Sequence, residues 1–105
     1  MFLSGRHLYV LFCCQQAVEK MLKALIAARL KEIPPRIHNL VRLAETAALQ
    51  PGSDRLDFLR ELSAYYVQSR YPEEIQEIAS HMRREEAQRV LNQTEEAVGW
   101  LSSML

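Results

Sequence analysis

The sequence predicts an all-α protein, and three observations lead to this prediction. Apolar residues recur at three- and four-residue steps over long stretches, which is the spacing of one helix face. Outside these stretches no five residues alternate apolar and polar side chains, and no hairpin dipeptide such as Asn-Gly occurs. Prolines separate the stretches. We therefore expect an up-and-down antiparallel helical bundle of about four helices, in a single domain over residues 1–105.

The first predicted helix runs from Arg6 to Arg29, where no Pro or Gly interrupts the chain. Residues 8–12 are all apolar, so this part of the helix has no polar face, which is typical of a central helix covered on most sides. The second half has one apolar face, which consists of Val18, Met21, Leu22, Leu25 and Ile26. Pro34 and Pro35 stop the helix, because proline lacks the backbone N–H that a helix interior needs.

A shorter helix is predicted from His38 to Leu49, before the turn residues 50–53. We expect it to direct inward Ile37, Leu40, Ala44 and Ala47, and outward Arg42 and Glu45. Ser53 or Asp54 is the expected cap of the next helix. That helix should end near Ser69 or Arg70, because Pro72 follows. Its apolar residues are Leu56, Leu59, Leu62, Tyr66 and Val67.

Residues 73–82 have helical spacing but are short and acidic, so we expect only one or two partly ordered turns there. The last helix is clearer, because an unbroken apolar stripe continues to the C-terminus. The stripe consists of Ala87, Val90, Leu91, Thr94, Val98 and Leu101.

Composition excludes several classes of function. Thirteen Lys and Arg balance thirteen Asp and Glu, so the broad basic field of non-specific nucleic-acid binders is absent. The three glycines are isolated from one another, which excludes a Walker-type phosphate loop and a dinucleotide-binding glycine fingerprint. The longest apolar run, residues 8–14, is far shorter than the roughly 20 residues that span a membrane. We expect a soluble cytoplasmic protein that uses no cofactor and no membrane.

The cysteines and histidines do not suggest a metal site. Cys13 and Cys14 are adjacent, which suits neither a disulfide nor a zinc ligand pair, and we expect buried, reduced thiols. His7, His38 and His81 are far apart, and none has a ligating partner at helical spacing. We expect the His38 ring to satisfy backbone groups at the start of its helix, and the alternative is a role in binding.

Polar residues of the first helix are grouped. Gln16, Lys20 and Lys23 share one face at i, i+4 and i+7, so two ammonium groups could meet a phosphate. The alternative is that Glu19 and Lys23 form an ordinary i, i+4 pair on a solvated stripe.

A second group lies at residues 65–72, where three tyrosines and Arg70 precede Pro72. Aromatic rings stack on bases and a guanidinium grips a phosphate or carboxylate, so the group favours binding over bond cleavage. The alternative has Tyr66 in the core, Arg70 paired with Glu73 or Glu74, and Tyr71 packed before the proline.

Three motifs occur in one order along the chain. They are Gln15-Gln16-Ala17-x-Glu19-Lys20-x-x-Lys23-Ala24, then His38-x-Leu40-x-x-Leu43, and then Arg70-Tyr71-Pro72. With them the chain resembles HEPN-domain proteins from about Leu8 to Leu101. Relatives carry one more amphipathic helix before the segment that matches residues 3–7. Either the start codon is assigned late or that helix is absent, and its absence would expose apolar surface on the helix containing residues 8–25 and favour self-association.

The resemblance implies a helical bundle, usually a homodimer, in small prokaryotic proteins. Such proteins are often encoded beside a minimal nucleotidyltransferase as a toxin-antitoxin pair, and the family name refers to proposed nucleotide binding. Many members are metal-independent ribonucleases that use an Arg and a His separated by four to six residues. Here ten residues separate Arg70 from His81, and none of the other nine arginines has a His at the required spacing.

The leading functional prediction is therefore a non-enzymatic or weakly active HEPN protein that forms a homodimer, binds a nucleotide or RNA phosphate, and pairs with a nucleotidyltransferase. The candidate binding residues are Lys20, Lys23, His38, Arg70 and Tyr71. One alternative is a ribonuclease in which His81 reaches Arg70 by an irregular path or across a dimer. Another is a helical protein-interaction module without a small-molecule ligand.

Overall fold

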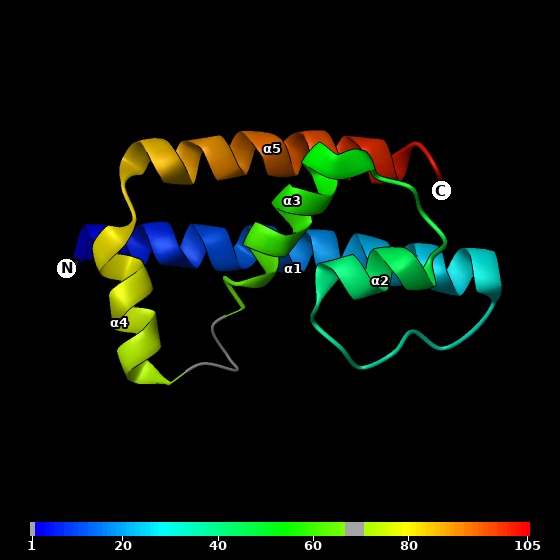
Figure 1. Ribbon diagram of the computed structural model, residues 1–105, viewed down its shortest axis with the longest axis horizontal. Coiled ribbons are helices and arrows are strands. Elements are labelled where there is room, and N and C mark those ends of the chain that lie inside the picture. Colours follow the sequence, from blue (N-terminus) through cyan, green and yellow to red (C-terminus); the bar gives the residue numbers. More distant parts are fainter. Residues whose placement is uncertain (1, 67–70) are drawn as a thin grey trace.

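A computed structural model of the chain describes residues 2–66 and 71–105, and these residues form five helices (Figure 1). Their bounds are Phe2–Leu30 for α1, Leu40–Thr46 for α2, Gly52–Ser63 for α3, Pro72–His81 for α4 and Arg84–Ser102 for α5. The described residues contain no strand, so the predicted all-α class is confirmed. None of the five helices is both long and apolar enough to cross a membrane.

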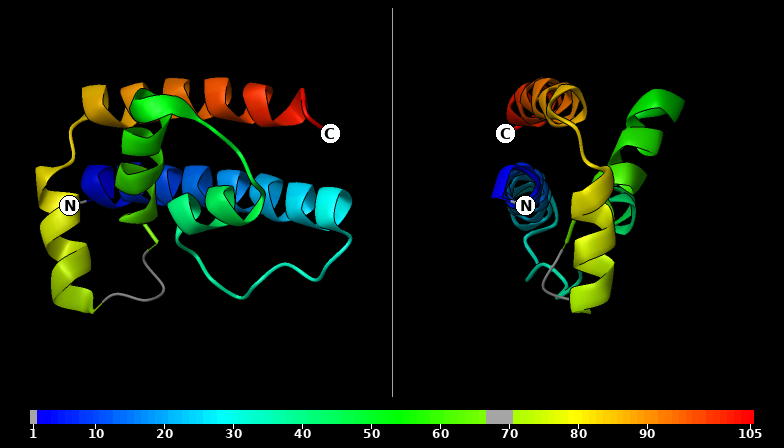
Figure 2. Two further views of the ribbon diagram at one scale, coloured as in Figure 1. Left: turned by 45° about the vertical axis from the view of Figure 1, so that its right-hand side comes forward. Right: turned by 90° about the vertical axis from the view of Figure 1, so that its left-hand side faces the viewer.

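Helix α1 is the centre of the fold. It contacts every one of the other described helices, and its most extensive contact is with α5. The two long helices lie side by side and run in the same direction, because the chain returns from the end of α1 to the start of α5 through the shorter helices (Figure 1). The all-helical bundle thus has five helices and not about four in its described residues, and its main pair is parallel where an antiparallel arrangement was predicted. Helices α2, α3 and α4 lie on one side of this pair (Figure 2). The prediction of a central first helix is thereby confirmed.

The core lies between α1, α5 and the shorter helices. Its largest fully buried apolar side chains are Leu11, Val18, Leu22, Leu25, Ile26, Leu40, Leu43, Leu62, Val90 and Leu101. Full burial of a side chain of this size contributes about 1.5–3 kcal/mol relative to exposure. Because α1 supplies half of these residues, its packing positions every other element.

Helix α1 is longer than predicted at its N-terminal end. It begins at Phe2, not at Arg6, so the segment 3–7 that resembles a connection in relatives is helical. Its C-terminal end is close to the prediction, since the helix stops at Leu30 and Lys31 follows with a φ of 54°.

Helix α2 is shorter than predicted at both ends. It begins at Leu40 because Asn39, and not His38, caps it: the Asn39 side chain accepts a hydrogen bond of 3.2 Å from the Arg42 N–H. It ends at Thr46, where Ala48 adopts a φ of 60°. The Leu49 N–H then donates to the Ala44 carbonyl at 3.0 Å, and the Ala48 N–H donates to Glu45 at 2.9 Å. This pair of bonds is a Schellman motif, which closes the helix.

Helix α3 also departs from the prediction. Its first residue is Gly52 and its cap position is Pro51, which has no side-chain hydrogen bond, so Ser53 and Asp54 lie inside the first turn and are not caps. It ends at Ser63, well before the predicted end. The Ser63 hydroxyl donates to the Leu59 carbonyl and accepts from the Leu40 N–H, both at 2.9 Å. That hydroxyl therefore joins the end of α3 to the start of α2.

Helix α4 is a continuous helix of ten residues where only one or two turns were predicted. Pro72 occupies its start, and the Tyr71 N–H donates to the Glu74 carboxylate at 2.9 Å. Glu73 and Glu74 in the first turn also favour the positive end of the helix dipole. Helix α5 follows the prediction, and Ala97 is a further buried residue in its apolar stripe.

Candidate functional site

The principal polar site joins the middle of α1 to the loop before α2. The two carboxylate oxygens of Glu19 lie 3.1 and 3.0 Å from Nδ1 of His38. Gln15 donates to Glu19 Oε1 at 2.8 Å, and Lys23 Nζ donates to Glu19 Oε2 at 3.0 Å. Together with Tyr66, which contacts His38, these residues form what we call the Glu19 cluster.

Glu19 is a buried carboxylate that stays ionised. Its side chain is 7% exposed, and this burial alone would raise its pKa. Hydrogen bonds from Gln15, Lys23 and His38, with the positive charge of Lys23, outweigh burial and lower the pKa of Glu19 below its ordinary value of 4.5. The cluster therefore contains a permanent negative charge at neutral pH, fixed from three directions.

The contacts of His38 differ from the prediction. Its ring bonds to the Glu19 carboxylate and not to backbone groups. The backbone carbonyl of His38 instead accepts a hydrogen bond of 3.3 Å from the Gln15 side chain. An ionised carboxylate can only accept, so Nδ1 is assigned as the donor and Nε2 points away from Glu19. The ring also stacks on Tyr66, with centroids 3.9 Å apart and planes 13° apart. The His38 side chain nevertheless remains 43% exposed.

The two lysines of the predicted phosphate face have different environments. The Glu19–Lys23 pair at i, i+4 is present, but its acidic partner is buried, so the interpretation as a solvated stripe is wrong. Lys20 is exposed and forms no ion pair with any acidic side chain in the described part of the chain. The ammonium group of Lys20 therefore faces solvent, whereas the ammonium group of Lys23 is bonded to the Glu19 carboxylate.

The remaining predicted residues lie at other places in the chain. Arg70 is outside the described residues. Tyr71 precedes α4 and is 74% exposed, so it is not packed before the proline. His81 is exposed in the last turn of α4, where Nδ1 lies 2.8 Å from the carbonyl of Glu77 in its own helix. The structure thus joins Lys23 and His38 through Glu19 and leaves Tyr71 and His81 at opposite ends of α4.

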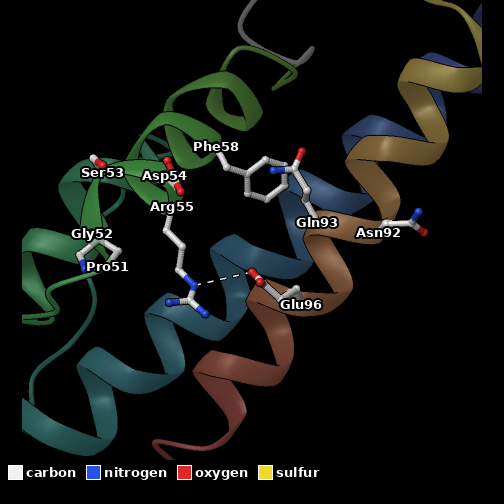
Figure 3. Close-up of a pocket in the computed structure, with 9 residues that line it drawn as sticks. All are labelled: Pro51, Gly52, Ser53, Asp54, Arg55, Phe58, Asn92, Gln93 and Glu96. Atoms are coloured by element: carbon white, nitrogen blue, oxygen red, sulfur yellow. Dashed lines mark ion pairs between the residues drawn. The ribbon is translucent and has the colours of Figure 1, made fainter.

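A separate cavity of about 600 Å³ lies between the start of α3 and α5 (Figure 3). Arg55 extends across it toward Glu96, with its Nε 3.7 Å from the Glu96 carboxylate (Figure 3). The guanidinium carbon also lies 4.4 Å from the centre of the Trp100 ring, a cation–π contact. Asp54 and Glu96 both line the cavity, so two carboxylates outnumber the single guanidinium of Arg55, which disfavours a phosphate there.

The two cysteine thiols have different environments, which the sequence predicted only in part. Cys14 is buried, and burial raises the pKa of its thiol, whereas Cys13 is exposed, so the expectation of two buried thiols is half wrong. In residues 2–66 and 71–105, no group of three or more His, Cys, Asp and Glu side chains is placed to hold a metal ion.

Glu19 and Tyr66 belong to the site although neither was among the candidate binding residues: Glu19 was predicted only as a possible partner of Lys23, and Tyr66 only as one of three tyrosines or as a core residue. One signal was available, because Gln15, Glu19 and Lys23 recur every four residues in a helix that is otherwise apolar on that side. The contact with Tyr66 had no such signal, because it lies 28 positions beyond His38 and depends on where α3 ends.

The fold and the Glu19 cluster define the chain as a small all-helical domain with a charged site on its central helix. The HEPN domain family matches residues 1–104, nearly the whole chain. The chain therefore belongs to the HEPN domain family, and the resemblance drawn from its motifs is confirmed. No curated protein and no solved structure matches it.

Proposed function

We propose that this HEPN domain binds a nucleotide or an RNA phosphate at the surface where Lys20 and Lys23 flank the Glu19 cluster. The observation that carries this proposal is that Glu19 fixes His38 and Lys23 at one carboxylate, while the next residue on α1, Lys20, is exposed and has no ion pair in the described part of the chain. A compact ammonium group on a surface helix attracts a phosphate as a point charge. Lys20 is the principal phosphate contact in this proposal. Lys23 supplies a second positive charge, and the His38 ring is a further surface for the ligand to contact.

Two further candidate contacts are Arg70 and Tyr71. Tyr71 is exposed, which a ligand contact requires. Arg70 stays a candidate from the sequence, because a guanidinium can hold a phosphate through two hydrogen bonds. In this proposal the domain acts by binding and not by cleavage, since the Arg-to-His spacing of family ribonucleases is absent.

The biological role that fits such a domain is one member of a toxin-antitoxin-type pair with a minimal nucleotidyltransferase. Support for this part comes from family membership. A nucleotidyltransferase handles nucleotides, so a partner that binds a nucleotide phosphate or RNA is chemically consistent with it. Co-purification of the chain with a nucleotidyltransferase encoded by the adjacent gene tests the pairing, and separate elution of the two proteins contradicts it.

The phosphate contact is tested with Lys20→Ala and a matched control, Lys31→Ala. Both variants remove one exposed lysine charge, but Lys31 follows α1 at its far end. We expect Lys20→Ala to weaken binding of ribose 5-phosphate by about tenfold, the loss of roughly one charge-assisted hydrogen bond. Lys31→Ala should bind as the wild type does. Calorimetric titration measures both, and equal affinities for wild type and Lys20→Ala contradict the proposal.

A further inference from the structure

We propose that the exposed face of His38 is a stacking platform for a nucleobase. This inference rests on the proposed function and specifies its ligand: a nucleotide held by its base on His38 and by its phosphate at the α1 lysines, Lys20 and Lys23. Stacking on a flat ring and attraction to an ammonium group are separate interactions, so each can be removed without the other.

Three aromatic rings form a short ladder that ends at His38. The Phe12 and Tyr66 centroids are 6.0 Å apart with planes tilted by 45°, and Tyr66 lies almost parallel to His38 at 3.9 Å. Tyr66 covers one face of the imidazole and Glu19 covers its Nδ1 edge. These two contacts do not cover the opposite face of the ring or the edge that carries Nε2, and 43% of the His38 side chain is exposed. A planar aromatic ligand placed on that face would extend the ladder by one ring.

The imidazole is held in place before any ligand binds. Both oxygens of Glu19 lie within 3.1 Å of Nδ1, and Glu19 is itself fixed by Gln15 and Lys23. A ring that is already immobilised loses little conformational freedom when a base stacks on it, which favours binding. A freely rotating surface histidine would not have this advantage.

The position of Lys23 makes a base and a phosphate compatible in one ligand. Lys23 Nζ and His38 Nδ1 each lie 3.0 Å from Oε2 of Glu19, so an ammonium group and the imidazole stand beside the same carboxylate oxygen. Lys20 follows Glu19 on α1, about 100° further around the helix, and supplies a second, exposed ammonium group. Because every base has an aromatic face, we expect binding with little preference among bases.

The test compares two substitutions of one residue. His38→Gln keeps an N–H donor for Glu19 but removes the ring, whereas His38→Phe keeps a ring and removes the donor. The probes are AMP, adenosine, which lacks the phosphate, and ribose 5-phosphate, which lacks the base. Dissociation constants are measured for each protein with each probe. Circular dichroism melts establish that each variant is folded at the assay temperature.

We expect wild type to bind AMP at least about tenfold more tightly than ribose 5-phosphate, the contribution of one stacked base. His38→Gln should lose this difference and His38→Phe should retain most of it, while ribose 5-phosphate binds all three proteins alike. Adenosine affinity should follow the same order as AMP. If one variant fails to fold, the other still decides the inference: loss of the AMP preference in His38→Gln or its retention in His38→Phe supports the platform, and the opposite result overturns it.

Other outcomes separate the two proposals. Equal wild-type affinities for AMP and ribose 5-phosphate overturn the stacking platform and leave the phosphate site intact. An AMP preference that survives unchanged in His38→Gln also overturns it. Binding of adenosine that depends on the His38 ring, without binding of ribose 5-phosphate, supports the platform and overturns the phosphate site. Absence of binding for all three probes overturns both.

Discussion

At the scale of single residues, the most unusual feature of this chain is a carboxylate within its central helix. Transfer of an ion from water to a buried position costs several kcal/mol, so a buried Glu19 requires compensating donors. Gln15, Lys23 and His38 supply them, and each comes within 3.1 Å. The same bonds that stabilise Glu19 also fix the loop residue His38 against α1. Structural stability and orientation of the binding surface therefore depend on one side chain.

This dependence predicts how stability changes with pH. The folded pKa of Glu19 lies below its ordinary value of 4.5, so the folded state binds this proton less readily than the unfolded chain. The stabilisation is complete above pH 4.5 and is lost as the pH falls from there through the folded pKa. We expect Glu19→Gln to lack this part of the acid dependence and to be less stable at pH 7 by about 1–3 kcal/mol, since His38 and Lys23 lose a charged acceptor.

The measurement is urea unfolding at pH 7 and at a series of acidic pH values. Glu45→Gln is the matched control, because Glu45 is exposed on α2 and forms no ion pair in the described part of the chain. That control should follow the wild type at every pH. An acid dependence in Glu19→Gln equal to that of the wild type would show that Glu19 is not the ionised group inferred from its contacts.

At the scale of helices, periodicity located the long elements and failed at the ends of the short ones. Helices α1 and α5 each bury one continuous stripe, which a sequence displays directly. The end of α2 depends on Ala48 in a left-handed conformation, and alanine gives no signal for that position. Helix α4 was underestimated because Ala79 is its only buried residue, while its start is stabilised by Pro72 and the first-turn glutamates.

The conformation of Ala48 predicts that an alanine-to-glycine substitution stabilises the fold at this helix end, whereas the same substitution inside a helix destabilises it. Ala48 has a φ of 60°, a region where a Cβ atom costs roughly 1–2 kcal/mol. Ala48→Gly should therefore stabilise the fold by about 0.5–1 kcal/mol after the greater freedom of glycine in the unfolded chain is deducted. Ala28→Gly, the same change at an exposed position inside α1, should destabilise by about 0.5–1 kcal/mol. Thermal unfolding measures both, and a lower melting temperature for Ala48→Gly contradicts the strain assignment.

At the scale of the whole molecule, the candidate site is assembled from segments that are distant in the sequence. Lys20, Lys23 and His38 could be proposed from residue type and spacing, but their connection could not. It depends on loop 31–39 returning along α1 and on α3 ending early enough to place Tyr66 beside His38. Both are consequences of tertiary packing, which helical periodicity does not encode. Arg70 remains a prediction from the sequence.

The packing also leaves one face of α1 uncovered. Helix α5 and the layer of α2, α3 and α4 cover its other sides (Figure 2). The uncovered face carries exposed side chains that recur at helical spacing and are small or apolar except for Lys20, namely Tyr9, Cys13, Ala17, Lys20, Ala24 and Ala28. Small side chains allow another helix to approach closely, and exposed apolar surface favours association. We therefore expect a homodimer in which the part of this face from Tyr9 to Ala17 packs against the same part of α1 of its partner, which leaves Lys20 accessible.

Ala17 tests this arrangement because it lies near the middle of the uncovered face. In a symmetric dimer, Ala17→Glu would bring two like charges into one interface, at a position where apolar contact is expected. We expect wild type to sediment as a dimer at tens of micromolar and Ala17→Glu to shift strongly toward monomer, with its helical circular dichroism unchanged. Gln76→Glu adds the same charge on exposed α4 and should remain dimeric. A wild-type monomer at these concentrations contradicts the dimer, whereas a dimer that survives Ala17→Glu places the interface away from α1, with the exposed face of α5 as the next surface to substitute.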